Sequence, residues 1–143
     1  MSKFSMFMKE NKKVKENAKF AATNSLCDSE GKPLMWELRH ISSKENEAIR
    51  DSCIVETAVA GKSGAVRSKL KTGLYVQKLI AASVAFPDLY DAELQDSYGA
   101  KTPEELLMAL VDDPGEYNRL AEFVQHFQGF DLSLDEKVEQ AKN

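Results

Sequence analysis

Two helix starts in the second half of the chain constrain the fold most strongly. Thr102-Pro103-Glu104-Glu105 and Asp113-Pro114-Gly115-Glu116 each place a capping side chain directly before a proline, with Glu at the third helical position. A side-chain oxygen at the N-cap binds free backbone N–H groups, and proline is favoured at the first helical position. A further capping box, Ser133-x-x-Glu136, follows. The second half is therefore predicted to be helical.

The segments after these starts carry apolar stripes at helical spacing. The helix from Pro114 shows Tyr117, Leu120, Ala121, Val124 and Phe127 on one stripe, and Leu106, Leu107 and Leu110 line the helix before it. Such stripes are typical of helices that pack on a core. We also expect one long helix from about Val66 to Phe86, ending before Pro87. The capping box Ser42-x-x-Glu45 starts an earlier helix that runs on to the loop at Ala60–Gly64.

The first part of the chain has a different period. Leu34, Trp36 and Leu38 alternate along the chain with Met35, Glu37 and Arg39, and this period of two predicts a half-buried strand. A turn-forming stretch, residues 28–33, precedes it and joins it to an extended run, residues 14–26. We predict a small antiparallel β-hairpin over residues 14–41, with Trp36 buried against the helices.

These elements predict an α+β, mostly helical single domain with a small N-terminal β-hairpin. Residues 1–12 are expected to form an arm or short helix, and residues 13–143 one globular domain with helices over 43–142. The length of 143 residues, with 43% hydrophobic and 29% charged residues, suits one self-supporting core.

No apolar run is long enough to cross a bilayer, and no secretion signal is present, so we expect a cytoplasmic protein.

Charge is distributed unevenly along the chain. Residues 1–24 hold six Lys and two Glu, whereas residues 86–143 hold four basic and fourteen acidic residues. An acidic second half argues against a nucleic-acid surface there, and the basic start lacks Arg and interleaved aromatics. We therefore expect no nucleic-acid partner.

Catalytic motifs are weak. Gly61-Lys62-Ser63 is similar to the tail of a phosphate-binding loop, but position 56 is Glu where that loop needs Gly. His40 and His126 have no second ligand at metal spacing, and Cys27 and Cys53 are too far apart to pair as metal ligands. Asp113 of the Asp112-Asp113 pair is explained by a helix cap. We predict a non-enzymatic protein with no cofactor and no metal.

Apolar clusters are the remaining functional candidates. Phe4, Phe7 and Met8 precede the domain and are followed by a Lys-rich stretch. In a helix, positions 4, 7 and 8 share one face, which suits packing on a helical partner. Phe123 and Phe130 form a second candidate cluster, whereas Phe127 lies on the core stripe. These five residues, Phe4, Phe7, Met8, Phe123 and Phe130, are the predicted partner-binding residues.

Short stretches spread over nearly the whole chain resemble the tail assembly chaperones of contractile-tailed phages and defective prophages of Gram-positive bacteria. The main ones are Gly31-Lys32-Pro33-Leu34, Trp36-Glu37-Leu38-Arg39, Ile49-Arg50-Asp51-Ser52-Cys53, Glu93-Leu94-Gln95-Asp96-Ser97-Tyr98-Gly99 and Pro114-Gly115-Glu116-Tyr117. No stretch is a catalytic motif, and their order and spacing carry the resemblance.

The resemblance implies a helper protein of virion assembly. It would bind the tape measure protein and hold it soluble while the tail tube polymerises. The tail tube protein and a second copy of the chain are further candidate partners. The alternative is a structural adaptor or baseplate component that stays in the tail particle. The family supplies no binding residues to carry over, so the candidate site rests on the apolar clusters alone.

Overall fold

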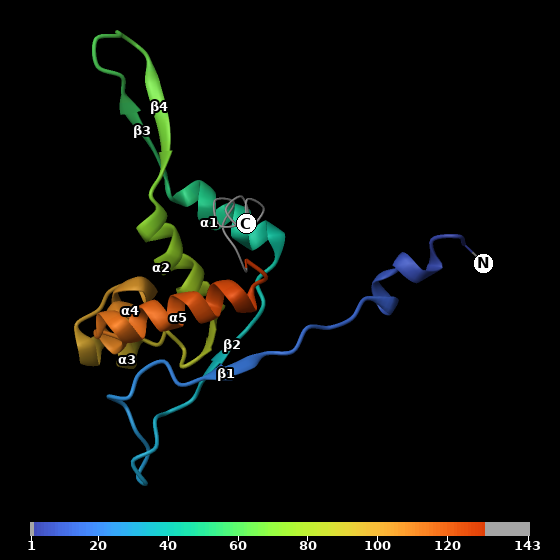
Figure 1. The fold of residues 1–143 in the computed structure, drawn as a ribbon, viewed down its shortest axis with the longest axis vertical. Helices are drawn as coiled ribbons and strands as arrows, with labels where there is room; N and C mark the ends of the chain where they lie inside the picture. Colours follow the sequence, from blue (N-terminus) through green and yellow to red (C-terminus); the bar gives the residue numbers. More distant parts are fainter. Residues whose placement is uncertain (1, 131–143) are drawn as a thin grey trace, which may run out of the picture.

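The computed structural model describes residues 2–130, which form a mixed α+β domain with an arm in front of it (Figure 1). Three strands make the main sheet: β1 (Ala18–Phe20), β2 (Trp36–Leu38) and β5 (Val84–Phe86). Their order is β1-β2-β5, and both pairings are antiparallel. The predicted N-terminal β-hairpin is therefore confirmed, and β5 extends it to three strands.

The helices are α1 (Ser43–Ser52), α2 (Thr72–Ser83), α3 (Ala92–Tyr98), α4 (Pro103–Leu110) and α5 (Pro114–Phe127). Helix α2 is central, since it packs against α1, α4 and α5. The core combines the two buried side chains of β2 with the apolar faces of α2, α4 and α5. Its largest fully buried members include Leu38, Leu79, Ile80, Leu89, Leu106, Leu107 and Leu120.

The predicted helix starts are confirmed in detail. The Ser42 hydroxyl accepts from the backbone N–H of Glu45, whose carboxylate accepts from the Ser42 N–H. Thr102 Oγ1 caps α4 through the Glu105 N–H, and Asp113 caps α5 through the N–H groups of residues 115 and 116. Each cap satisfies backbone donors that a helix leaves free at its start. The Ser133 capping box lies outside the described residues.

The predicted long helix over Val66–Phe86 is wrong. Only Thr72–Ser83 is helical, and it is bounded by strand β4 (Val66–Leu70) before it and β5 after it. At one end, the Lys71 N–H donates to the Cys53 carbonyl, which continues a strand pairing. At the other end, residues 84–86 are extended and pair with β2, which agrees with the bias against helix just before a proline. The hydrogen bonds that these segments form with distant strands therefore decide their conformation, although the apolar residues are spaced as in a helix.

Strand β4 belongs to a hairpin that the sequence analysis did not predict. The helix from Ser43 ends at Ser52, and Ile54–Ala58 forms β3, which pairs antiparallel with β4. Figure 1 shows this hairpin projecting from the helical body, and nearly all of its side chains are exposed. The alternation of Val66, Ser68 and Leu70 with basic residues was the signal for a strand here.

Trp36 is buried, with 2% of its surface exposed, as predicted. Leu38 on the same strand is also buried, but Leu34 is 44% exposed. Leu34 lies before the first residue of β2 and outside the sheet, so strand parity does not decide its environment.

Candidate protein-binding surfaces

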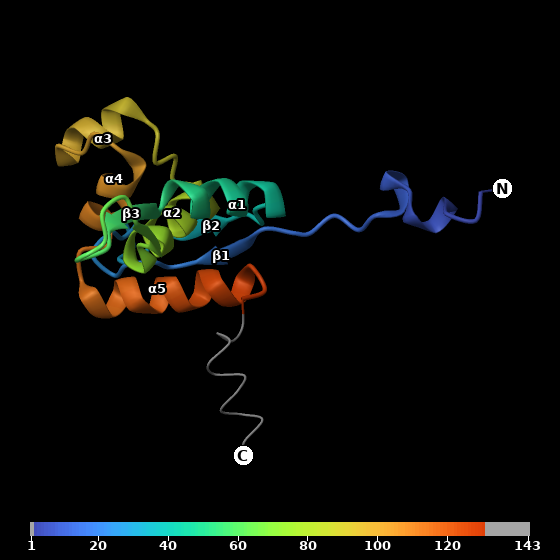
Figure 2. The ribbon, with the colours of Figure 1, turned by 90° about the horizontal axis from the view of Figure 1, so that it is seen from above.

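The N-terminal arm holds three of the predicted partner-binding residues. Phe4, Phe7 and Met8 are 57%, 85% and 46% exposed. The two phenyl rings contact each other edge to face, with centroids 6.4 Å apart. Figures 1 and 2 both show the arm extending well away from the helical body. An exposed group of large apolar side chains is typical of a surface that contacts another molecule.

The arm is not one continuous helix. It contains two 3₁₀ turns, Ser5–Phe7 and Lys9–Asn11, separated at Met8, whose backbone is extended. The expectation that positions 4, 7 and 8 share one helical face is therefore wrong for the described conformation. The Phe4–Phe7 contact nevertheless keeps two of the three side chains together. Residues 12–17 then run without secondary structure to β1.

The C-terminal aromatic cluster is divided between core and surface. Phe123 is half-buried and stacks on Phe20 of β1 with ring centroids 4.4 Å apart. Phe127 packs on the core beside it, and the His40 ring stacks on Phe127 at 3.9 Å. Phe130, just beyond α5, is 42% exposed. Of the two predicted residues in this cluster, Phe123 mainly joins α5 to the sheet, and Phe130 is the more accessible.

A third apolar surface was missed by the sequence analysis. An open groove of about 210 Å³ lies where the segment before β2, the end of β5, and helices α3 and α4 meet. Its lining residues are Leu26, Leu34, Met35, Trp36, Phe86, Pro87, Leu94, Tyr98 and Leu110. Phe86, Met35 and Leu34 expose 62%, 50% and 44% of their surface. We refer to it as the β5 groove. It draws on four separate segments, so no local pattern signals it.

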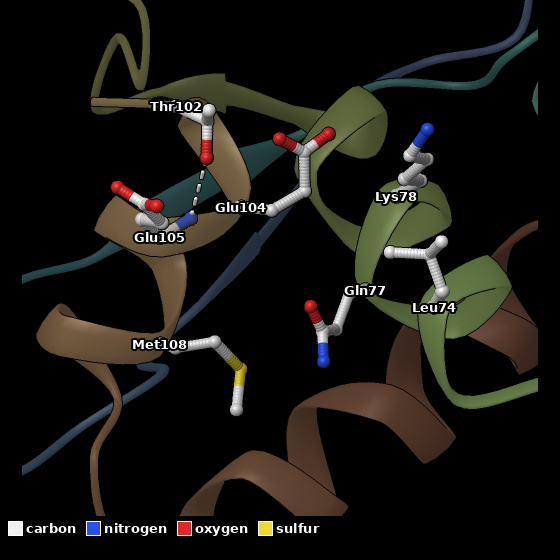
Figure 3. Close-up of a pocket in the computed structure, with 7 residues that line it drawn as sticks. All are labelled: Leu74, Gln77, Lys78, Thr102, Glu104, Glu105 and Met108. Carbon is white, nitrogen blue, oxygen red and sulfur yellow. Dashed lines mark hydrogen bonds between the residues drawn. The ribbon is translucent and has the colours of Figure 1, made fainter. Parts of the chain in front are cut away.

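A larger hollow of about 440 Å³ lies between α2 and α4 (Figure 3). Two of its polar side chains make hydrogen bonds that serve the fold. The Thr102 hydroxyl caps α4, and Lys78 Nζ donates to the Ser52 hydroxyl at 3.1 Å. Leu74 and Met108 supply its apolar part, and Figure 3 shows Gln77 between them. The arrangement offers no nucleophile paired with a base, so it gives no support to a catalytic site.

The Gly61 loop lies at the tip of the β3–β4 hairpin. Gly61 and Gly64 have positive φ values of 77° and 75°, which suit the tight reversal between two strands. A phosphate-binding loop instead joins a strand to a helix N-terminus, whose N–H groups bind the anion. The similarity of Gly61-Lys62-Ser63 to such a loop is therefore confined to the residue types.

The other polar candidates have structural partners. His40 stacks on Phe127, and Asp113 caps α5. Within residues 2–130, no group of three or more His, Cys, Asp or Glu side chains is arranged to hold a metal ion. Over the same residues, no helix has the length and apolar character needed to cross a bilayer.

One ion pair has a clear electrostatic role. Arg39, just after β2, binds the carboxylate of Glu45 in the first turn of α1. The hydrogen bond from Arg39 lowers the pKa of Glu45 and raises the pKa of Arg39. Burial raises the pKa of Tyr75 and of Tyr117. These shifts accompany packing between elements and do not converge on one site, so they do not mark a catalytic centre.

The fold and these surfaces define a small α+β protein with several exposed apolar surfaces. A family model described as phage XkdN-like tail assembly chaperone protein matches residues 4–142. The chain therefore belongs to the XkdN-like phage tail assembly chaperone family, which confirms the resemblance.

A solved structure has the same fold. The crystal structure of the protein yqbn superposes with a TM-score of 0.74 and 16% sequence identity, covering 92% of this chain and 99% of that one. No curated protein sequence matches the chain.

Proposed function

We propose that the chain binds the phage tape measure protein in the host cytoplasm and keeps it soluble while the tail tube polymerises. Membership of the tail assembly chaperone family supports a role in tail assembly with protein partners. The proposed client is a long helical protein, and apolar helical faces that are exposed before assembly favour aggregation. A chaperone that covers them needs no reaction, so we propose a non-catalytic role.

The exposed apolar arm is the observation that supports this proposal most directly. Phe4, Phe7 and Met8 are exposed, and the arm that carries them extends away from the helical body (Figures 1 and 2). Lys9, Lys12 and Lys13 follow directly and keep the segment hydrated. Phe130 and the half-buried Phe123 are proposed as a second contact. Release requires no nucleotide if tube subunits displace the chaperone by mass action.

Co-purification tests the proposed client. The tagged chain is expressed together with the tape measure protein, and the soluble fraction is purified through the tag. We expect the tape measure protein to co-purify and to become insoluble when the chain is omitted. Recovery of equal amounts of soluble tape measure protein with and without the chain would contradict the proposal.

Purified tail particles distinguish the proposal from a structural role. A chaperone is absent from finished tails, whereas an adaptor or baseplate component is present in fixed stoichiometry. Mass spectrometry of purified particles measures this directly. Stoichiometric recovery of the chain in the particles would favour the adaptor.

A further inference from the structure

Two apolar surfaces of this chain are exposed and lack a partner in the described domain. One is the arm, with Phe4, Phe7 and Met8, and the other is the β5 groove, whose most exposed side chains are Met35 and Phe86. At about 210 Å³ the groove is smaller than a typical small-molecule pocket, which occupies roughly 300–1,000 Å³. Its lining is almost wholly apolar. A few large apolar side chains suit such a groove better than a cofactor does.

We propose that the β5 groove binds the N-terminal arm of a second copy of this chain, with Phe4 and Phe7 as the inserted side chains. The contact covers both apolar surfaces at once. It does not depend on the proposed client, because it is formed by this chain alone and is measured without the tape measure protein.

Charge complementarity supports this occupant. Residues 88–98, which run through α3 along the groove, contain four acidic residues and no basic one. Asp88, Asp91, Glu93 and Asp96 are all exposed. The arm and its connection to β1, residues 2–17, contain five Lys and two Glu. An apolar segment with a basic flank therefore meets an apolar groove with an acidic flank, and such complementarity favours the pairing and speeds the encounter.

The geometry favours a second copy over the chain's own groove. In Figures 1 and 2 the arm leaves β1 on the side of the body opposite α3, which forms one wall of the groove. The connection, residues 12–17, spans at most about 20 Å when fully extended. To reach the groove of its own molecule, the arm would have to reverse its direction and pass around the sheet. The groove of a second molecule can bind the arm without that reversal.

Sedimentation velocity of the full-length chain over a concentration series tests the proposal. We expect the parent to associate as concentration rises. An arm variant, Phe4→Ser with Phe7→Ser, and a groove variant, Met35→Ser with Phe86→Ser, are each expected to associate at least about tenfold more weakly. All four side chains are exposed, so the folds are retained, and circular dichroism checks this. Val14→Ser, which alters a 91% exposed side chain in the connection, is the matched control and should associate like the parent.

Mixing the two variants gives the sharpest result. The arm variant keeps an intact groove and the groove variant keeps an intact arm, so an equimolar mixture is expected to form a 1:1 complex that neither forms alone. Added salt should weaken it, because the charges involved are exposed. A parent that stays monomeric at all concentrations, variants that associate as the parent does, or a mixture that stays monomeric would each overturn the proposal.

Discussion

The Thr23 hydroxyl donates a 2.7 Å hydrogen bond to Oε1 of Glu116, although 93 residues separate the two. The other carboxylate oxygen, Oε2, accepts the backbone N–H of Asn24 at 2.7 Å. Glu116 lies in the first turn of α5, where a negative charge is favourable. One carboxylate therefore joins the loop after β1 to the start of α5. Thr23 is 1% exposed, so the bond lies at the edge of the core.

Thr23→Val should lower the free energy of unfolding by about 1–3 kcal/mol, because it removes a hydroxyl that bonds to the part-buried Glu116 carboxylate and to Ser25 while nearly preserving shape. Urea denaturation measures the change. Thr57→Val is the matched control, since Thr57 lies on the exposed β3–β4 hairpin, and it should change the free energy by less than about 0.5 kcal/mol. Equal effects of the two substitutions would show that the Thr23–Glu116 bond is not stabilising.

Trp36→Ala should lower the free energy of unfolding by about 3–5 kcal/mol, because the indole is 2% exposed and packs in the core. Trp36 is the only tryptophan, so the fluorescence of the parent reports on it alone. We expect a blue-shifted emission maximum that moves to the red on unfolding. Tyr90→Ala, at a 73% exposed ring, is the control. Emission typical of hydrated indole in the folded protein would contradict the strand assignment.

Glu45→Gln should alter the pH dependence of stability. Arg39 lowers the pKa of Glu45 in the folded state, so the stabilisation is present above the ordinary pKa near 4.5 and is lost as pH falls through the lower, folded-state pKa. Gln keeps the capping-box hydrogen bond but not the charge. The difference in free energy of unfolding between parent and variant should therefore be larger at pH 7 than at pH 3. Glu47→Gln, an exposed position on α1, controls for net charge, and an unchanged difference across this range would refute the assignment.

ATP or GTP with magnesium should not stabilise the protein, because the Gly61 loop joins two strands and presents no helix N-terminus to a phosphate. Thermal melting measures this. A ligand at a hundred times its dissociation constant would add about 2.7 kcal/mol, which is readily detected. A shift that disappears in Lys62→Ala would support a nucleotide site and count against the proposed function.

The arm variant Phe4→Ser with Phe7→Ser should melt within about two degrees of the parent, because both rings lie outside the core. Co-expressed with the tape measure protein, it should leave more of that client insoluble, since each lost anchor typically costs more than about 1 kcal/mol in binding. Val14→Ser again serves as the control. Normal client solubility would place the binding surface elsewhere, with Phe130 the next residue to test.

The sequence by itself determined the elements that depend on local chemistry. The caps at Ser42, Thr102 and Asp113 act within three residues of the helix they start, so the residues present are sufficient to predict them. The burial of Trp36 and the apolar stripe of α5 follow from short-range periodicity for the same reason. Helix α3 was missed, although the Asp91 cap and Gly99, with φ at 68°, are local signals of its two ends.

Only the tertiary structure decided which apolar segments became strands and which surfaces remained exposed. Residues 84–86 are extended because they pair with β2, almost fifty residues earlier, and Val66–Leu70 is extended because it pairs with β3. A helical period within Val66–Phe86 contains no information about those partners. The β5 groove likewise exists only where separate segments meet, and Phe123 is half-buried because the fold places Phe20 against it. Strand pairing and core packing between distant segments form many weak contacts together. Their summed free energy outweighs the local conformational preference of any single segment.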